Sequence, residues 1–282
     1  MGFSVALSAA RSGQRVYWAS AGRSKASADR AAEAGLTDAG TLAELCRICE
    51  MIVSICPPEF AEATARQVAG HGFRGSYLDA NAISPRRAAW IAECVTAGGA
   101  DFVDGGIIGL PARERGKTWL CLSGPRAADA AACFKDGPLE VTLLGDDPVR
   151  ASTLKMCYAA YNKGAIAMLM AVLGAASRLG VLDELRQQWS HQNLNWDREV
   201  VKIERAAPKA WRWAPEMREI AETLAGAGMT PGFHEAAAEL YARLAGFKDA
   251  KGLELADVLA GLDIGRAQLT AAAVPGEPAD LY

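Results

Sequence analysis

Residues 1–18 read MGFSVALSAARSGQRVYW, and their pattern decides how the rest of the chain is interpreted. Gly2 opens an alanine-rich segment that predicts a helix, and Gly13 ends it. The residues that follow, 15–19, include β-branched and aromatic side chains and predict a short strand. Since a soluble domain rarely begins with a bare helix of this kind, the stretch raises the question of what precedes it.

The first half of the chain alternates short apolar runs with alanine-rich segments. The runs predict strands at residues 15–19, 51–56, 76–79, 101–104, 118–123 and 139–143. The segments between them predict helices near residues 24–34, 41–49, 59–70, 85–97 and 126–134. This alternation is typical of βαβ crossovers, so we expect an α/β fold with a Rossmann-type, doubly wound and mainly parallel sheet.

The strand pattern ends at the sequence Asp146-Asp147-Pro148. Beyond it the periodicity predicts only helices, at residues 149–179, 183–190, 196–206, 215–227 and 233–244. We therefore expect an α/β domain at residues 1–147 and an all-α domain at residues 148–282.

Composition excludes several classes of function. The 282 residues are 51% hydrophobic and carry a formal charge of −3, which supplies no basic field for nucleic acid. The uncharged stretch at residues 164–177 is too short to cross a bilayer, which needs about 20 residues. Seven scattered cysteines, three histidines and the absence of an export signal predict a cytoplasmic protein without a metal site, although Cys46 and Cys49 form a CxxC pair.

Gly2 has the context of a nucleotide-binding glycine. A dinucleotide-binding unit places G-x-G-x-x-G between its first strand and first helix, and the pyrophosphate rests at the helix N-terminus. Gly2 opens a slim helix that is followed by a strand, as the last glycine of that fingerprint does. An ordinary N-terminal helix is the alternative.

The chain resembles the β-hydroxyacid dehydrogenase family, the relatives of 6-phosphogluconate and 3-hydroxyisobutyrate dehydrogenases. In that family the fingerprint reads G-x-G-x-M-G, and Met1-Gly2 matches its last two letters. The resemblance implies that the central first strand of a 3-2-1-4-5-6 sheet lies upstream. Without it the strands at 15–19 and 51–56 face an empty slot, and each unpaired buried backbone group costs roughly 1–3 kcal/mol. We therefore expect the functional protein to begin some ten or more residues earlier.

The end of the strand at 15–19 predicts the cofactor. NAD-binding units place an acidic residue there, whereas this chain has no acid before Asp29. Gly22-Arg23-Ser24 is similar to the Asn-Arg-Thr of NADP-using relatives. The resemblance therefore assigns Arg23 and Ser24 to the 2′-phosphate of NADP, with Ser20 beside them; an ordinary exposed loop is the alternative.

Further cofactor contacts are expected where other strands end, because doubly wound sheets bind ligands at their carboxyl edge. Cys56 and Pro57 close one strand. The stretch Asp79-Ala80-Asn81-Ala82-Ile83-Ser84-Pro85 resembles the family's Asp-x-Ser-Thr-x-Ser-Pro and would turn Asn81 toward the nicotinamide ribose. Ser84 is expected to cap the next helix.

Lys155 is the candidate catalytic residue. Oxidation of a hydroxy acid needs a group that takes the hydroxyl proton, and Lys155 is the sole charge in the apolar stretch 151–161, a costly place for an ammonium. A structural lysine whose side chain extends to the surface is the alternative. The family carries a catalytic lysine on this helix, often with an asparagine four residues on. Here that position is Ala159, and Asn162, seven residues on, is the candidate substrate donor. Lys163 projects about 80° from Lys155 and is a weaker candidate.

The substrate motif departs from the family. In place of Asp-x-x-x-Ser-Gly-Gly the chain has Asp104-Gly105-Gly106-Ile107-Ile108-Gly109, with Ile108 at the serine position. We expect Gly106, Ile108 and Gly109 to contact substrate, since glycines let a backbone approach a ligand. This version resembles a less characterised branch whose helical domain has no known function.

The resemblance implies an NADP-dependent oxidoreductase that acts on CH–OH groups of a 3-hydroxy acid or a related carbonyl compound, with Lys155 as proton donor or acceptor. Family members pair through the helical half, so a homodimer is expected. An inactive nucleotide-binding homologue and an imine-reductase-like enzyme are the alternatives. The sequence leaves the identity of the substrate open.

Overall fold

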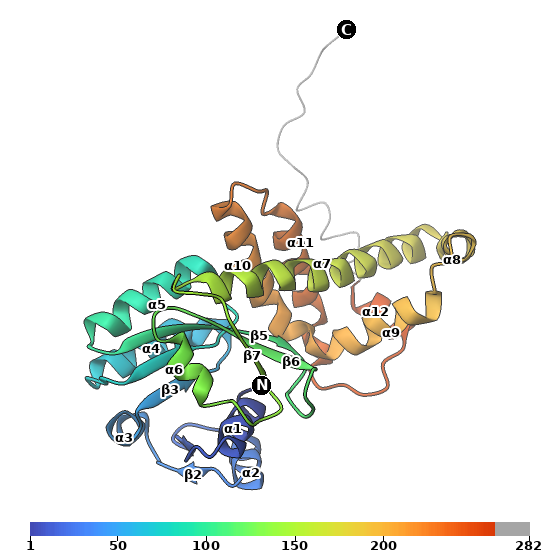
Figure 1. Ribbon diagram of the computed structural model, residues 1–282. Helices are drawn as coiled ribbons and strands as arrows, with labels where there is room; N and C mark the ends of the chain where they lie inside the picture. The colour runs from blue at the N-terminus through green and yellow to red at the C-terminus, as the bar shows by residue number, and fades with distance from the viewer. Residues whose placement is uncertain (263–282) are drawn as a thin grey trace. The chain divides into compact units, whose positions relative to one another are not determined.

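The computed structural model describes residues 1–262 (Figure 1). The strands are β1 Tyr17–Trp18, β2 Thr37–Asp38, β3 Met51–Ser54, β4 Ser76–Asp79, β5 Asp101–Gly109, β6 Thr118–Ser123 and β7 Glu140–Leu143. The helices between them are α1 Gly2–Arg11, α2 Lys25–Glu33, α3 Leu42–Ile48, α4 Ala61–Gly70, α5 Pro85–Ala97 and α6 Ala127–Ala132. The α/β alternation predicted for the first half is confirmed.

The strands form two separate sheets. β1 and β2 pair in parallel, whereas the other strands form a five-stranded sheet in the order β3-β4-β5-β6-β7. The pairs β3–β4, β4–β5 and β6–β7 are parallel, and only β5–β6 is antiparallel among them. The sheet is therefore mainly parallel, and β1 and β3 lie in different sheets.

Helices cover both faces of the five-stranded sheet (Figure 1). On one face Val5 of α1 and Ala130 of α6 join a buried core with Leu78, Val103 and Leu120. On the other face Tyr77 and Phe102 pack with side chains of α4 and α5, among them Val68, Ile91 and Val95. Because neighbouring strand residues point to opposite faces, Tyr77 and Leu78 belong to different cores.

The rest of the described chain is helical, as predicted. Its helices are α7 Arg150–Leu179, α8 Leu182–His191, α9 Trp196–Ala206, α10 Ala210–Gly226, α11 Gly232–Arg243 and α12 Leu255–Gly261. Strand β2 and helix α12 were not predicted.

The compact units divide elsewhere than at the predicted boundary near residue 147. One unit comprises Met1–Gly164 and Pro215–Ala236, and the other comprises Ala165–Ala214 and the described residues from Ala237. The first turns of α7 belong with the sheet because they pack directly on β5: a β-carbon added to Gly106 would lie 2.7 Å from the Ala151 carbonyl oxygen.

Helix α7 is long and apolar enough to span a membrane by length and composition, with a mean hydropathy of 1.3 in its most apolar window. One such helix is weak evidence, because core helices of globular proteins meet the same criteria. The uncharged stretch at residues 164–177 is only part of this helix.

Candidate active site

Two lysines of α7 meet one glutamate of α10. Glu216 Oε2 forms an ion pair with Lys163 Nζ, and Glu216 Oε1 lies 3.9 Å from Lys155 Nζ. The three side chains are largely buried, with exposed fractions of 15% for Lys155, 18% for Lys163 and 8% for Glu216. All three belong to the compact unit that contains the five-stranded sheet. We call these residues the lysine–glutamate cluster.

Lys155 lies over the β5–β6 pair. A β-carbon added to Gly106 would stand 3.1 Å from the Lys155 β-carbon, so the missing side chain of Gly106 makes room for this part of α7. Cys121 is the β6 partner of Gly106. Burial raises the pKa of the Cys121 thiol, and the charge of Lys155 acts in the opposite direction. The predicted catalytic lysine is therefore a side chain held against the sheet rather than one that reaches into open solvent.

The N-terminus of α7 is anchored by two buried side chains of the sheet. Asp104 of β5 accepts hydrogen bonds from the Ser152 N–H at 2.7 Å and the Ser152 hydroxyl at 2.5 Å. Ser123 of β6 donates to Asp104 at 3.3 Å and accepts from the Ala151 N–H at 3.0 Å. Burial raises the pKa of Asp104 to about 6, and the hydrogen bonds from Ser152 and Ser123 oppose that shift.

His234 of α11 packs on α7 close to Lys163. Its Nε2 lies 3.1 Å from the Ala160 carbonyl oxygen. A β-carbon added to Gly164 would lie 3.1 Å from the same nitrogen, so the glycine allows the contact. Within residues 1–262, His234 Nδ1 and Glu216 Oε1 are buried polar atoms without a hydrogen-bond partner. A hydrogen bond from a further donor to such a buried, unpartnered acceptor would be favourable, because the acceptor has already lost its hydrogen bonds to water.

Asn162 does not join the cluster. Its side-chain amide donates to the Tyr158 carbonyl oxygen at 2.9 Å on its own helix, and the residue is exposed. Lys163, which the sequence ranked lower, is the residue that meets Lys155 through Glu216. The lysine side chain is longer than that of asparagine, so Lys163 reaches Glu216 although it projects from a different angle of α7 than Lys155.

Gly106, Ile108 and Gly109 lie within β5 and pair with Cys121, Trp119 and Thr118 of β6. Their backbones are therefore part of a sheet ladder that continues beyond the predicted end of the strand at residue 104. Gly106 and Gly109 are approached by protein atoms: an added β-carbon at Gly109 would lie 2.3 Å from the Lys117 carbonyl oxygen. The structure places Gly106 beside Lys155, whereas substrate contact by these three residues stays a prediction.

The loop after β1 carries the residues predicted for the cofactor phosphate. Ser24 caps α2 by accepting from the Ser27 N–H at 3.3 Å, and Arg23 is exposed beside it. An acid is nevertheless present here, because pairing of β1 with β2 brings Asp38 next to Ser20. Hydrogen bonds from the Gly40 N–H, at 2.7 Å, and from Ser20 hold the pKa of Asp38 below its usual value.

Asn81 links the ends of β3 and β4. Its Oδ1 accepts from the Cys56 N–H at 2.6 Å, and its Nδ2 donates to Ser54 Oγ at 3.0 Å and to Asp79 Oδ2 at 2.9 Å. Both amide hydrogens are therefore used inside the protein, which differs from the predicted orientation toward a ribose. Burial raises the pKa of Asp79 to about 7, against the lowering effect of its hydrogen bonds with Asn81.

The remaining nucleotide candidates lie at the same edge. Burial raises the pKa of Cys56, and the positive charge of Arg23 opposes the shift, so the β1 loop and the end of β3 are electrostatic neighbours. Pro57 precedes a short 3₁₀ turn, Pro58–Phe60. At Gly2 an added β-carbon would be 3.8 Å from Ile55, an ordinary contact, so tight packing is not what requires glycine there. Among the described residues no side chain caps the N-terminus of α1.

A second set of contacts joins α10 to the N-terminus of α5, and the sequence analysis missed it. Glu219 accepts from the Ser84 N–H at 2.8 Å, and Glu222 accepts from the Ser84 hydroxyl at 2.6 Å. Arg87 pairs with Glu219, and Arg86 pairs with Glu222. The sequence carries one sign of these contacts: carboxylates recur every three residues along α10, at positions 216, 219 and 222.

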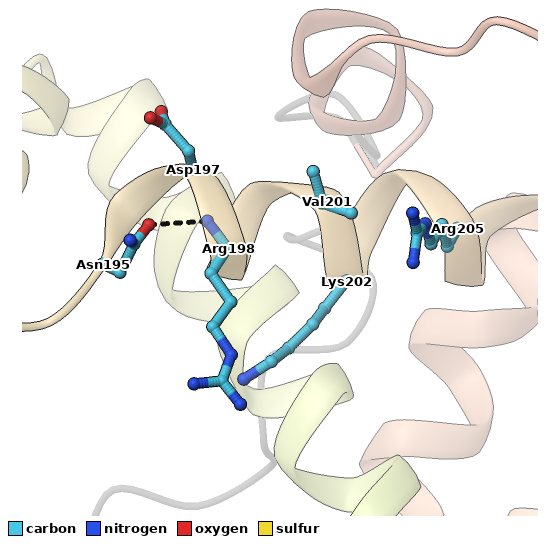
Figure 2. Close-up of a pocket in the computed structure, with 6 residues that line it drawn as sticks. All are labelled: Asn195, Asp197, Arg198, Val201, Lys202 and Arg205. Atoms are coloured by element: carbon cyan, nitrogen blue, oxygen red, sulfur yellow. Dashed lines mark hydrogen bonds between the residues drawn. The ribbon is translucent and has the colours of Figure 1, made fainter.

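A groove on α9 lies outside this site. Figure 2 shows its lining residues, all on or next to α9: Asn195, Asp197, Arg198, Val201, Lys202 and Arg205. Asn195 caps the helix by accepting from the Arg198 N–H at 2.9 Å. The groove belongs to the other compact unit and contains none of the residues predicted for catalysis or cofactor binding.

The fold combines an α/β region, which has a mainly parallel sheet, with a helical region. A family model described as a domain of unknown function, DUF1932, matches residues 176–244. An uncharacterized 28.5 kDa protein from the 7S RNA 5′ region of Methanothermus fervidus is 33% identical over 143 residues, 50% of this chain and 54% of that protein. The match therefore spans about half the length of this curated relative.

Solved structures share the fold over nearly the whole chain. A conserved protein of unknown function, described as structurally similar to 3-hydroxyacid dehydrogenases, has 25% identity and a TM-score of 0.63 over 87% of this chain and 93% of its own. A 3-hydroxyisobutyrate dehydrogenase from Salmonella typhimurium has 20% identity and a TM-score of 0.65, with coverages of 92% and 94%. These comparisons show that the chain shares the fold of 3-hydroxyacid dehydrogenases.

A reductive aminase from Aspergillus terreus, solved with NADPH and ethyl levulinate, shares the fold at 17% identity and a TM-score of 0.51, over 93% of this chain and 94% of its own. The fold is therefore common to carbonyl-directed and imine-directed enzymes.

The raised pKa of Asp104 predicts a pH-dependent stability. Between pH 4 and 6 the native protein binds a proton that the unfolded chain releases, so the Asp104 contribution to the free energy of unfolding falls as pH rises through this window. Asp104→Asn cannot titrate, so its stability relative to wild type should improve by roughly 2–3 kcal/mol from pH 4 to pH 7. Urea unfolding of both proteins across this range measures the difference. Exposed Asp136→Asn is the control, and parallel wild-type and Asp104→Asn curves would contradict the assignment.

Proposed function

We propose that the protein is an NADP-dependent oxidoreductase that transfers a hydride between the nicotinamide and a 3-hydroxy acid or a related carbonyl compound. The observation that supports it best is the position of Lys155: a largely buried amine packed over Gly106 of β5 in a dehydrogenase-type fold. The family comparisons support an oxidoreductase in general, and the substrate class and the role of Lys155 are our proposal.

The nicotinamide supplies the hydride, with its two electrons, when the cofactor is bound. In the direction of reduction, the Lys155 ammonium donates a proton to the substrate oxygen as the carbonyl carbon gains the hydride, which leaves the amine neutral until solvent reprotonates it. In the direction of oxidation, the neutral amine takes the hydroxyl proton. The anchoring of α7 by Asp104 and Ser123 keeps the amine in register with β5.

The described residues fit the phosphate end of NADP. Arg23 offers a guanidinium beside the Ser24-capped N-terminus of α2, and a cation together with a helix N-terminus suits a phosphate. Ser20 is held by Asp38 beside them. Gly2, Cys56 and Pro57 lie toward the same carboxyl edge. We assign Asn81 a supporting role there, since its side chain holds the Cys56 N–H in place.

Imine reduction is the second candidate, because a reductive aminase shares the fold. A catalytically inactive nucleotide-binding homologue is the third, because Ile108 replaces the serine that relatives use for the substrate carboxylate. A panel of 3-oxo acids, 3-hydroxy acids and imines, each monitored through NADPH absorbance, separates the three. No turnover on any class would favour the nucleotide-binding homologue.

Lys155→Met tests the catalytic assignment. Removing the amine should lower kcat about 100-fold or more, the range for a lost general acid or base, while NADPH binding persists. Turnover on the best panel substrate and NADPH fluorescence measure the two properties. Lys117→Met changes an exposed lysine before β6 and should alter neither. A Lys155→Met enzyme with wild-type kcat would refute the proposed mechanism.

Arg23→Gln tests the cofactor. Loss of a charge-assisted hydrogen bond to the 2′-phosphate should raise KM for NADPH about tenfold or more and leave KM for NADH unchanged. Arg15→Gln, an exposed arginine at the opposite end of β1, is the matched control. Equal losses with both cofactors would remove Arg23 from the phosphate site.

We propose a homodimer that forms through α7. Large apolar side chains are exposed along this helix at intervals of three, four or seven residues: Leu154, Tyr158, Tyr161, Met168, Val172 and Leu179. This spacing puts them in one stripe, and a second copy of the chain offers an equally long apolar stripe to cover it. All seven cysteines are free thiols, which suits the cytoplasmic location that we also propose.

Met168→Glu places a charge in the centre of the stripe and should convert the dimer to a monomer. Light scattering during size-exclusion chromatography measures the mass. Ser177→Glu adds the same charge to an exposed site of α7 about 140° around the helix from Val172 and should leave the dimer intact. A wild-type monomer, or binding to lipid vesicles by wild type alone, would overturn the dimer.

A further inference from the structure

Glu216 is a buried carboxylate whose negative charge needs neighbouring cations or hydrogen-bond donors. Its side chain is 8% exposed, and a buried carboxylate is stable only when cations or donors surround it. Lys163 supplies one cation through Oε2, and Lys155 supplies a second at 3.9 Å from Oε1. The two lysine α-carbons are eight residues apart on α7, about 12 Å along the axis, so one carboxylate draws both amines to a common point.

The two oxygens of Glu216 differ in their partners. Oε2 is occupied by Lys163, whereas Oε1 is buried and accepts no hydrogen bond from the described residues. The separation of 3.9 Å from Lys155 Nζ is too long for a hydrogen bond but short enough for a strong Coulomb interaction. Oε1 is therefore an acceptor directed at the amine that the proposed reaction uses.

The position of Glu216 is fixed by the rest of its helix. Glu219 and Glu222 follow Glu216 on α10 by three and six residues. Both bind the N-terminus of α5, through Ser84, Arg86 and Arg87. Helix α5 follows β4, whose end belongs to the candidate cofactor edge. The carboxylates of α10 thus connect Lys155 on α7 to the element that begins beside Asn81.

We infer that Glu216 is a positioning residue for Lys155: its Oε1 holds the lysine ammonium over β5, while Lys163 competes for the same carboxylate through Oε2. The inference rests on the proposed function only for its catalytic consequence. The contact itself concerns residues of this chain and can be tested without a substrate. Other titratable groups that face the cluster are Cys121 on β6 and His234 on α11.

The test measures the rate at which an amine-acylating reagent labels Lys155 as a function of pH, by mass spectrometry of the digested protein. Glu216→Gln removes the negative charge that attracts the Lys155 ammonium without changing side-chain size, so the amine is held less firmly and labelling should accelerate about three- to tenfold. The exposed Lys117 in the same sample is the internal reference. Glu235→Gln, an exposed carboxylate of α11, is the matched control and should leave the rate unchanged.

Lys163→Gln distinguishes positioning from loosening of the fold. This substitution removes a competing cation and frees Glu216 for Lys155, so labelling of Lys155 should become slower than in wild type. General loosening would accelerate labelling in both variants. Acceleration in Lys163→Gln, or no change in Glu216→Gln, would overturn the inference, and the thermal midpoint of each variant shows whether it is folded. If Glu216→Gln does not fold, Glu216→Asp and Lys163→Gln carry the test.

The catalytic consequence is measured on the best panel substrate. Glu216→Gln should lower kcat about tenfold and shift the pH profile of kcat, with KM for NADPH unchanged, and Glu216→Asp should recover part of the loss. If Lys155→Met abolishes turnover but Glu216→Gln has neither effect, the inference fails and the proposed function stands. If Lys155→Met is fully active, the proposed function fails whatever the labelling shows.

Discussion

The contact between the first turn of α7 and strand β5 is the constraint on which the rest of the site depends. Asp104 and Ser123 anchor the helix N-terminus, and Gly106 lets the helix backbone approach the strand. These features fix both the direction of α7 and its distance from the sheet. Lys155, one turn further along, therefore has a defined place over the β5–β6 pair, and the position of Lys163 follows from the same helix.

Much of the fold could be predicted because its elements carry strong local signals. The strands Ser76–Asp79 and Thr118–Ser123 and the helix Pro85–Ala97 have the predicted bounds, since each combines an apolar pattern with clear end signals. Strand β5 runs five residues beyond its predicted end at Asp104. The sequence related the glycines that follow to the approach of a ligand. In the structure an added β-carbon on Gly105 or Gly106 would contact the carbonyl oxygen of Asp79 or Ala151 within 3 Å, so tertiary packing requires them.

The candidate site could be predicted in part. Lys155 was identifiable because a lone charge in an apolar helix is conspicuous. Glu216 was not, because its meaning depends on a contact between helices about 60 residues apart in sequence. The same limit applies to Asp38, which only strand pairing brings to Ser20, and to Asn81, whose amide is used by Cys56, Ser54 and Asp79.

The division into two sheets has an energetic consequence for ligand binding. Within the described chain no ladder hydrogen bonds join the β1–β2 pair to the five-stranded sheet, and Arg23 lies in the loop that follows β1. A dinucleotide that lay across both carboxyl edges would contact both parts, and a ligand that binds only their assembled form stabilises that assembly by its own binding free energy. In that case cofactor binding and the assembly of the two sheets are coupled. A change in the free energy of assembly then alters the free energy of cofactor binding by the same amount, and the reverse also holds.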